Sequence, residues 1–328
     1  MLKRYANNPI ITGDPSSKWY PKKVYNPTVV KKDNRYYMLF RGVGEDWISR
    51  ILLATSDNGV DFKIEPEPVI FPENPWENRG CEDPRMVYID GKYFTTYTAY
   101  DGKTARIAMA SSPDLYHWQK HNLLFPRLAH PQRENLPVDW SKAAAILPET
   151  INGRYYLLFG DNHIWPAMSD DFMKWHPISI PIISARAGLF DAAYVEMGPP
   201  PIHTAKGWLV FYHGIDEISD TRTYRLGAAL LSLNDPMEVL WRCNKPILEP
   251  EEKYETIGYA DLIPGGYQAL RSMSDDDINK LAEEDVLPKA VFCCGAILED
   301  DNVIRLYYGA GDTRICTATV DLETILAS

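Results

Sequence analysis

The stretch Pro84-Arg85-Met86-Val87-Tyr88, with the turn Asp90-Gly91 and the run Tyr93-Phe94-Thr95-Thr96-Tyr97, decides the fold that we expect. Each run is rich in β-branched and aromatic residues, and a two-residue turn between such runs is typical of a β-hairpin. A third run, Ile107-Ala108-Met109-Ala110-Ser111, predicts one more strand. The unit is therefore expected to be a small antiparallel sheet.

The same pattern occurs five times along the chain. Equivalent points fall at Pro27, Pro84, Ala143, Pro200 and Phe292, so the successive spacings are 57, 59, 57 and 92 residues. A repeated small sheet has to bury both faces against its neighbours, which is typical of the blades of a propeller. We therefore expect an all-β protein, in which residues 1–328 form a single five-bladed β-propeller domain.

The long last interval predicts a helical insertion before the last blade, at about residues 259–287. Within it, Ser274 is suited to a helix N-cap, three aspartates follow, and Ile278 and Leu281 fall on one face of a helix. A short helix in this place is compatible with a lid, with a contact between copies in a homo-oligomer, and with a surface decoration.

The composition excludes several functional classes. A hydrophobic content of 45% and a charged content of 24% over 328 residues are those of an ordinary globular protein. A formal charge of -11 disfavours nucleic acid and anionic membranes as partners. The five cysteines show neither a CxxC motif nor a Cys/His metal spacing, so we expect no disulfide framework and no structural zinc. The N-terminal segment lacks the apolar region of a signal peptide, and no apolar run is long enough to span a membrane, so we expect a cytoplasmic location.

A polar set of side chains falls where the innermost strands of the blades would converge. The set comprises Asn26, Arg41, Glu82, Asp83, Lys142, Tyr212, His213 and Asp312. A structural channel would more often be filled by small apolar residues, so this concentration favours a small-molecule site. Acids, an asparagine and aromatic residues suit a sugar, whose hydroxyls need polar partners and whose ring faces stack.

Two kinds of chemistry fit this set. Cleavage of a glycosidic bond needs a positioned acid, and Asp83 or Glu82 can serve. An inverting hydrolase then needs a second carboxylate to activate water, whereas a phosphorolytic enzyme needs groups that hold phosphate, for which Lys142, His213 and Arg127 are candidates. Each residue also has a structural interpretation: Glu82 and Asp83 as an ion-paired strand entrance, Lys142 and Arg127 at the surface, and His213 in the core.

The motifs resemble the β-mannoside phosphorylases of glycoside hydrolase family 130. The resemblance covers nearly the whole chain and rests on Tyr25-Asn26-Pro27, Cys81-Glu82-Asp83-Pro84-Arg85, Ser141-Lys142-Ala143, Gly198-Pro199-Pro200-Pro201-Ile202, Gly207-Trp208-Leu209-Val210-Phe211-Tyr212-His213-Gly214, Tyr224-Arg225-Leu226-Gly227-Ala228-Ala229-Leu230-Leu231 and Tyr307-Tyr308-Gly309-Ala310-Gly311-Asp312-Thr313. It implies phosphorolysis of a β-mannoside with inversion, which gives α-D-mannose 1-phosphate. It implies no metal and no organic cofactor, because inorganic phosphate is the co-substrate.

The resemblance also implies roles for individual residues. Asp83 would be the general acid, its proton passing directly or through a mannosyl hydroxyl. From its place beside Asp83 at the head of the second repeat, we expect Glu82 to orient the substrate or a neighbouring base. The mannose ligands would be Asn26, Arg41 and Asp312, and the phosphate ligands would be Arg127, Lys142, Tyr212 and His213.

Two segments, 159–166 and 258–288, depart from the family pattern where the leaving sugar would be recognised, so the linkage (β-1,4 or β-1,2) and the leaving sugar stay open. The family also contains hydrolases that lack the basic phosphate ligands, and the presence of Lys142 and His213 therefore favours phosphorolysis. The alternatives are an inverting β-mannosidase and a non-catalytic glycan-binding propeller.

Overall fold

The computed structural model describes residues 2–21, 23–128, 137, 139–216, 223–256, 274, 277, 289–299 and 302–327. Strands dominate these residues, which confirms the all-β class. The helices with defined bounds are short: the 3-10 helix η1 (Pro75–Glu77), α1 (Lys253–Thr256) and α5 (Leu322–Leu326). Within the described ranges, no helix combines the length and apolarity needed to cross a membrane.

The first two repeats are four-stranded antiparallel units. The first unit contains β3 (Lys23–Lys32), β4 (Arg35–Val43), β5 (Ser49–Ser56) and β6 (Lys63–Ile64). The second contains β7 (Gly80–Ile89), β8 (Lys92–Tyr100), β9 (Ala105–Ser112) and β10 (Gln119–Leu123). A single parallel pairing of Ser49 with Gly80 joins the two units into one eight-stranded sheet.

The remaining three units are separate five-stranded sheets. The third contains β11 (Ala144–Ile146), β12 (Tyr155–Phe159), β13 (His163–Ser169), β14 (His176–Pro177) and β15 (Ile183–Ser184). The fourth contains β16 (Tyr194–Met197), β17 (Ile202–Thr204), β18 (Gly207–Ile215), β19 (Arg225–Leu231) and β20 (Val239–Arg242). The fifth contains β21 (Val291–Leu298), β22 (Val303–Ala310) and β23 (Arg314–Asp321), together with the N-terminal strands β1 (Lys3–Arg4) and β2 (Ile11–Thr12).

The fourth unit differs from the expected pattern. The sequence places its first strand around Pro200, whereas two short strands, β16 and β17, pair with successive parts of β18. Pro199, Pro200 and Pro201 lie between them, and a proline has no amide hydrogen to donate to a sheet. The innermost strand of this unit is therefore β16, which the sequence pattern did not indicate.

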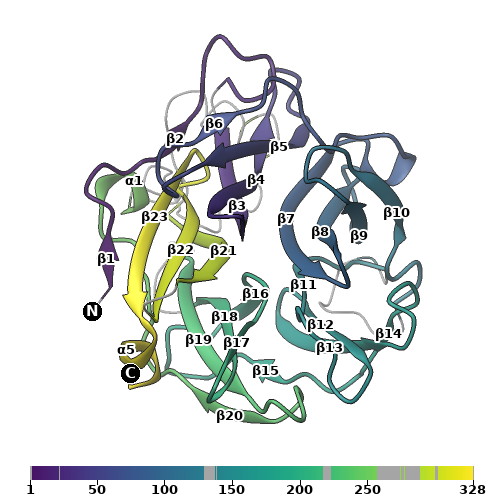
Figure 1. Ribbon diagram of the computed structural model, residues 1–328, viewed down its shortest axis with the longest axis vertical. Helices are drawn as coiled ribbons and strands as arrows, with labels where there is room; N and C mark the ends of the chain where they lie inside the picture. The colour runs from purple at the N-terminus through teal and green to yellow at the C-terminus, as the bar shows by residue number, and fades with distance from the viewer. Residues whose placement is uncertain are drawn as a thin grey trace.

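The five units surround a common centre, with β3, β7, β11, β16 and β21 nearest to it (Figure 1). Both N-terminal strands pair with β23, so the start of the chain completes the sheet that the end of the chain forms. The described strands form four separate hydrogen-bonded sheets rather than one continuous sheet.

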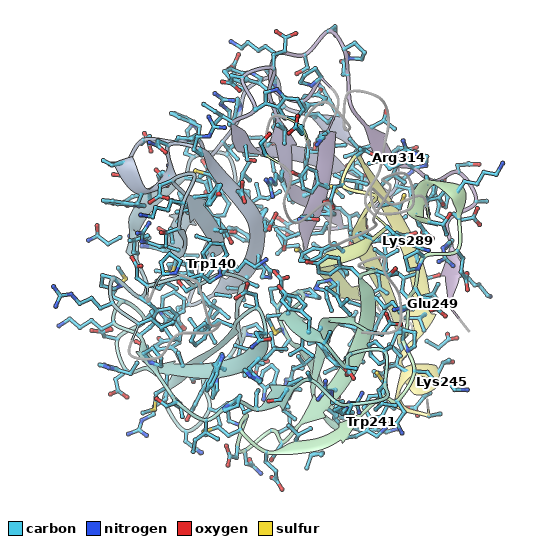
Figure 2. The ribbon with its side chains drawn as sticks, turned by 180° about the vertical axis from the view of Figure 1, so that it is seen from behind. Trp140, Trp241, Lys245, Glu249, Lys289 and Arg314 are labelled. Carbon is cyan, nitrogen blue, oxygen red and sulfur yellow. The ribbon has the colours of Figure 1, made fainter. Side chains whose placement is uncertain are left out.

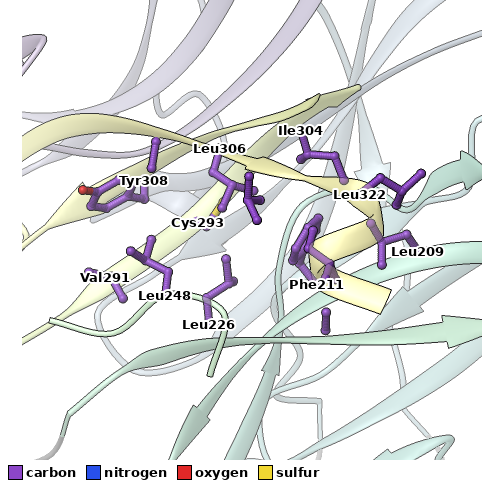
Figure 3. Close-up of a cluster of buried hydrophobic side chains, with 14 of the residues drawn as sticks. Leu209, Phe211, Leu226, Leu248, Val291, Cys293, Ile304, Leu306, Tyr308 and Leu322 are labelled. Carbon is purple, nitrogen blue, oxygen red and sulfur yellow. The ribbon is translucent and has the colours of Figure 1, made fainter. Parts of the chain in front are cut away.

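Among the described residues, the hydrophobic core forms five clusters, and each lies between two neighbouring units. One cluster packs Leu209 and Leu226 of the fourth unit against Val291 and Leu306 of the fifth (Figure 3). Three others lie between the first and second, second and third, and third and fourth units. The last brings Tyr307 of the fifth unit into contact with the first unit. Each small sheet thus buries both faces, as the repeat predicts.

The expected helical insertion at about 259–287 lies outside the described residues, except for two positions. There the Ser274 hydroxyl accepts a hydrogen bond from the Asp277 amide at 3.2 Å, the contact expected of an N-cap serine. All five cysteines are free and buried.

Candidate active site

Two β-bulges present polar side chains at the same point of neighbouring units. Asn26 on β3 and Asp83 on β7 both have φ of 52°, and the strand register shifts at each of them. This left-handed region is uncommon for residues other than glycine, and asparagine and aspartate tolerate it best. A bulge re-aims a side chain, and bulges are frequent beside active sites. The two bulges bring the amide of Asn26 within 2.8 Å of the carboxylate of Asp83.

Arg41 joins the acidic pair. Its guanidinium lies 2.7 Å from Glu82 and 3.2 Å from Asp83, so one cation bridges both carboxylates. The Ser49 hydroxyl accepts a hydrogen bond from Arg41 at 2.9 Å and donates one to Glu82 at 3.1 Å. The sequence-predicted residues Asn26, Arg41, Glu82 and Asp83 therefore lie together.

The surroundings shift the pKa values of Glu82 and Asp83 in opposite directions. Burial tends to raise both pKa values, but the Arg41 charge and the Asn26 hydrogen bond outweigh it and lower the pKa of Asp83. For Glu82, burial prevails over Arg41 and raises the pKa. In the substrate-free protein the proton of this pair therefore resides more readily on Glu82 than on Asp83.

Asp312 faces the same group of charges from the end of β22. It also has φ of 52°. Burial raises the pKa of Asp312 to about 6, the Arg41 charge opposes the rise, and the Asp83 charge adds to it. Asp312 is therefore a carboxyl group that gains and loses a proton close to neutral pH.

Lys142 is paired with a carboxylate that the sequence did not reveal. Its ammonium lies 2.9 Å from the buried Glu196 on β16, and the Tyr194 hydroxyl donates to the other oxygen of Glu196 at 2.7 Å. A second buried carboxylate, Asp161, accepts hydrogen bonds at 3.3 and 3.2 Å from the indole of Trp140, labelled in Figure 2. Burial lowers the pKa of Lys142, but the Glu196 and Asp161 charges outweigh it and raise the pKa, so Lys142 remains charged.

His213 is a neutral hydrogen-bond donor rather than a cation. Its Nε2 accepts a hydrogen bond from the Cys293 amide at 2.8 Å, and its ring stacks on Phe292 with centroids 3.9 Å apart. Burial lowers the pKa of His213 to about 3. Because Nε2 is an acceptor, the proton of the neutral ring sits on Nδ1, which is buried and has no partner among the described residues. This N–H can donate to a bound anion.

Two predicted phosphate ligands, Tyr212 and Arg127, make no side-chain contact with Lys142 or His213 among the described residues. Tyr212 precedes His213 on β18 and therefore points to the opposite face of the sheet. Its hydroxyl donates to Asp191 at 2.8 Å and accepts from Arg242 at 3.0 Å. Arg127 is exposed, and no hydrogen bond or ion pair among the described residues connects it with Lys142 or His213.

Arg85 is a further cation near the centre. In the sequence it marks only the start of a predicted strand. Its buried guanidinium donates to the carbonyl oxygens of Gly198 and Met197, both at 2.7 Å, and of Asp83 at 3.0 Å. It therefore ties the acidic bulge of the second unit to the fourth unit. The indication in the sequence that Arg85 belongs to the site is its position directly after Glu82-Asp83-Pro84.

Comparison with known proteins identifies relatives along the chain. The sequence model of the glycoside hydrolase 130 family, described as β-1,4-mannooligosaccharide phosphorylase, matches residues 5–263. The 1,2-β-oligomannan phosphorylase of Thermoanaerobacter sp. (strain X514) is 32% identical, over 99% of this chain and 98% of the relative. The β-1,2-mannobiose phosphorylase of the same organism is also 32% identical, with the same coverage.

A solved structure is similar as well. It comes from a study of family 130 glycoside hydrolases that target β-1,2 mannosidic linkages in Candida mannan. Its TM-score is 0.81 with 26% identity, and the match covers 98% of this chain and 94% of that chain.

Proposed function

Because this chain belongs to glycoside hydrolase family 130, the family of the mannoside phosphorylases, we propose that it is an inverting β-mannoside phosphorylase. It cleaves a β-mannosidic bond with inorganic phosphate and releases α-D-mannose 1-phosphate. The observation that carries this proposal is an acidic group beside an anion-binding group. Asp83 lies on one side, and on the other lie charged Lys142 and the Nδ1–H of His213, which has no partner among the described residues.

Phosphate is held by Lys142 and His213 in this proposal. Lys142 supplies charge and His213 supplies a directed hydrogen bond, a combination suited to a phosphate oxygen. Arg127 is a third ligand, in which case its exposed side chain has to move when phosphate binds. Tyr212 acts from the other face of β18 by supporting the strand that carries His213.

The mannose to be transferred binds to Asn26, Arg41 and Asp312, with Glu82 orienting it. A phosphate oxygen attacks the anomeric carbon while the bond to the leaving oxygen breaks, and Asp83 supplies the proton for that oxygen, directly or through a mannosyl hydroxyl. Because the pKa of Asp83 is lowered in the substrate-free protein, a proton has to reach it. Glu82 and Asp312, whose pKa values are raised, are the sources. No metal or organic cofactor takes part in these steps.

An inverting β-mannosidase is the second candidate, because Glu196 provides a carboxylate that can activate water. The Lys142 ion pair opposes this role: although burial tends to raise the pKa of Glu196, the neighbouring Lys142 charge lowers it, which makes Glu196 a weak base. Phosphorolysis needs no base to activate water, so the lowered pKa of Glu196 does not count against it.

We also propose that the five units form a closed five-bladed propeller. The support is the set of five clusters between neighbouring units, including the contact of the fifth unit with the first, and the pairing of β1 and β2 with β23. A cytoplasmic location suits phosphorolysis, because the sugar phosphate is retained in the cell.

The test is to incubate the protein with β-1,2-mannobiose, and separately with β-1,4-mannobiose, with and without phosphate. We expect phosphate-dependent formation of α-mannose 1-phosphate, identified by NMR. Equal rates of mannose release with and without phosphate would establish the hydrolase instead. Lys142→Ala is expected to raise the KM for phosphate at least about tenfold. The surface variant Lys206→Ala, which removes an exposed pair with Glu323, is the matched control.

A further inference from the structure

A cavity of about 250 Å³ opens beside the acidic pair. It shares Arg41, Ser49 and Glu82 with the site described above, and Trp47 and Tyr100 form part of its remaining wall. Ligand pockets are typically about 300–1,000 Å³, so this volume suits one sugar ring rather than a long oligosaccharide. The cavity is thus a small compartment directly connected with the reacting groups.

Trp47 occupies a strained backbone position in the wall of this cavity. It has φ of 58°, an outlier for a bulky residue. Such conformations persist only where the surroundings impose them, and they concentrate at ligand sites. The partly exposed indole therefore lies where a relaxed backbone would not place it.

The turn that carries Trp47 is braced from several sides. The Trp47 amide donates to the Gly44 carbonyl at 3.0 Å, and Asp46 is paired with Arg50 at 2.7 Å. A Cβ atom at Gly44 would lie 2.7 Å from the Asp46 side chain and 3.0 Å from the Lys18 carbonyl oxygen, so a larger residue would crowd this turn. The Lys23 ammonium lies 5.1 Å from the centre of the indole ring. These contacts hold the turn that carries the ring.

The lining has the chemistry of a sugar subsite. An indole offers an apolar face on which the C–H face of a pyranose can stack, while its polar edge stays accessible. Lys23 and Arg79 of the lining can donate to sugar hydroxyls. Arg41 and Glu82, the proposed ligands of the transferred mannose, form the side of the cavity where the two sugars would meet. The lining is mainly charged and polar, with the aromatic rings of Tyr25, Trp47 and Tyr100 among these groups, and this mixture suits the hydroxyls and ring faces of a sugar.

The position of the cavity indicates which sugar it takes. Its wall comes from the first and second units, whereas Lys142, Glu196 and His213 belong to the third and fourth units, or lie directly before them. Asp83 lies between these two sides: its carboxylate contacts Arg41, and its carbonyl accepts a hydrogen bond from Arg85, which also donates to the Met197 carbonyl of the fourth unit. In an inverting displacement the nucleophile and the leaving group are on opposite faces of the reacting sugar.

We propose that this cavity is the subsite for the leaving sugar and that Trp47 is its stacking platform and a determinant of acceptor specificity. The proposal rests on the proposed phosphorylase function and deepens it. Arg79, which is exposed at the rim and packs over Gly102, completes the wall.

The test compares Trp47→Ala with Trp47→Phe in the reverse reaction, with α-mannose 1-phosphate as donor and mannose as acceptor. We expect Trp47→Ala to raise the KM for the acceptor about tenfold, the effect of losing one stacked ring, with the KM for mannose 1-phosphate changed less than about twofold. Trp47→Phe keeps a ring on the same backbone and is expected to restore most of the acceptor binding. Tyr88→Ala, which removes an aromatic ring that is 52% exposed, is the surface control.

An unchanged acceptor KM in Trp47→Ala would overturn the proposal, and so would an equal rise in both KM values. Titration of β-1,2-mannobiose into the Asp83→Asn protein, with and without Trp47→Ala, measures binding without turnover. It tests the cavity even if the protein proves to be a hydrolase: weaker binding of the disaccharide in the double variant supports the subsite, and equal binding overturns it.

Discussion

The ammonium of Lys142 lies 2.9 Å from the carboxylate of the buried Glu196. The same ammonium is proposed to bind phosphate. Glu196 therefore keeps a buried lysine charged, and under the proposed function it competes with phosphate for that charge.

Replacing Glu196 with glutamine should shift this balance. The variant removes a negative charge that repels phosphate, so we expect the KM for phosphate to fall several-fold. It also leaves Lys142 without its principal counter-charge, so we expect the free energy of unfolding to fall by about 3 kcal/mol in phosphate-free buffer. Steady-state kinetics and urea unfolding measure the two effects. A higher KM for phosphate would mean that Glu196 mainly positions Lys142.

Asp83→Asn removes the proposed proton donor and retains its shape. We expect the rate of phosphorolysis to fall about 10²–10⁴-fold, the usual contribution of a general acid, with little change in the KM for phosphate. The exposed Asp57→Asn, whose side chain is 91% accessible, is the control and should be fully active. Normal activity of Asp83→Asn would remove this residue from the mechanism.

The sequence reveals the acidic side of the site better than the basic side. Asn26 and Asp83 each stand directly before a proline at equivalent points of two repeats, so the periodic pattern alone aligns them. Glu196 lies on β16, which Pro199–Pro201 separates from β17, and the repeat therefore aligns the wrong segment. The partner of Lys142 became visible only when the fold brought the third and fourth units together.

Adjacent residues also mislead when strand geometry is ignored. Tyr212 and His213 stand next to each other in the sequence, and their shared motif groups them as ligands of one anion. Neighbouring side chains of a strand point to opposite faces, so Tyr212 joins Asp191 and Arg242 while His213 joins Phe292. Only a description of β18 and its neighbours separates the two roles.

Asp312 should make stability depend on pH in an unusual direction. Burial raises the pKa of Asp312 from 3.8 to about 6, so the folded protein holds this proton more tightly than the unfolded chain does. The resulting stability is fully present below pH 4 and is lost as pH rises through about 6, a change of about 3 kcal/mol. Asp312→Asn should remove this dependence and be the more stable protein at pH 7 to 8. Urea unfolding between pH 4 and pH 8 tests it, and parallel curves for the two proteins would contradict it.

If Asp312 also supplies the proton that reaches Asp83, the rate of phosphorolysis should depend on the protonation of Asp312. We expect kcat/KM for the mannoside to decline as pH rises through about 6, because the ionised carboxylate has no proton to give. The measurement is a pH profile at saturating phosphate. A profile that stays flat between pH 5 and pH 7 would assign the proton to another source, such as Glu82.

A buried ion pair links β1, the first strand of the chain, to α1. Arg4 on β1 donates to Glu255 at 3.1 and 3.0 Å, and Glu255 also accepts from the Tyr308 hydroxyl at 2.8 Å and from two backbone amides. Glu77 accepts the same kinds of contact before the second unit, from Tyr97 and two amides, which makes the arrangement a repeated anchor.

Removing one member of the Arg4–Glu255 pair should therefore be costly. Arg4→Ala leaves the Glu255 carboxylate buried without its guanidinium, and we expect the free energy of unfolding to fall by about 3–5 kcal/mol. Arg154→Ala breaks an exposed pair with Asp170 and should cost less than about 1 kcal/mol. Because Arg4→Ala/Glu255→Gln removes both charges, it should recover part of the loss. If Arg4→Ala costs no more than Arg154→Ala, then backbone pairing of β1 and β2 with β23 holds the chain ends together, and the ion pair contributes little.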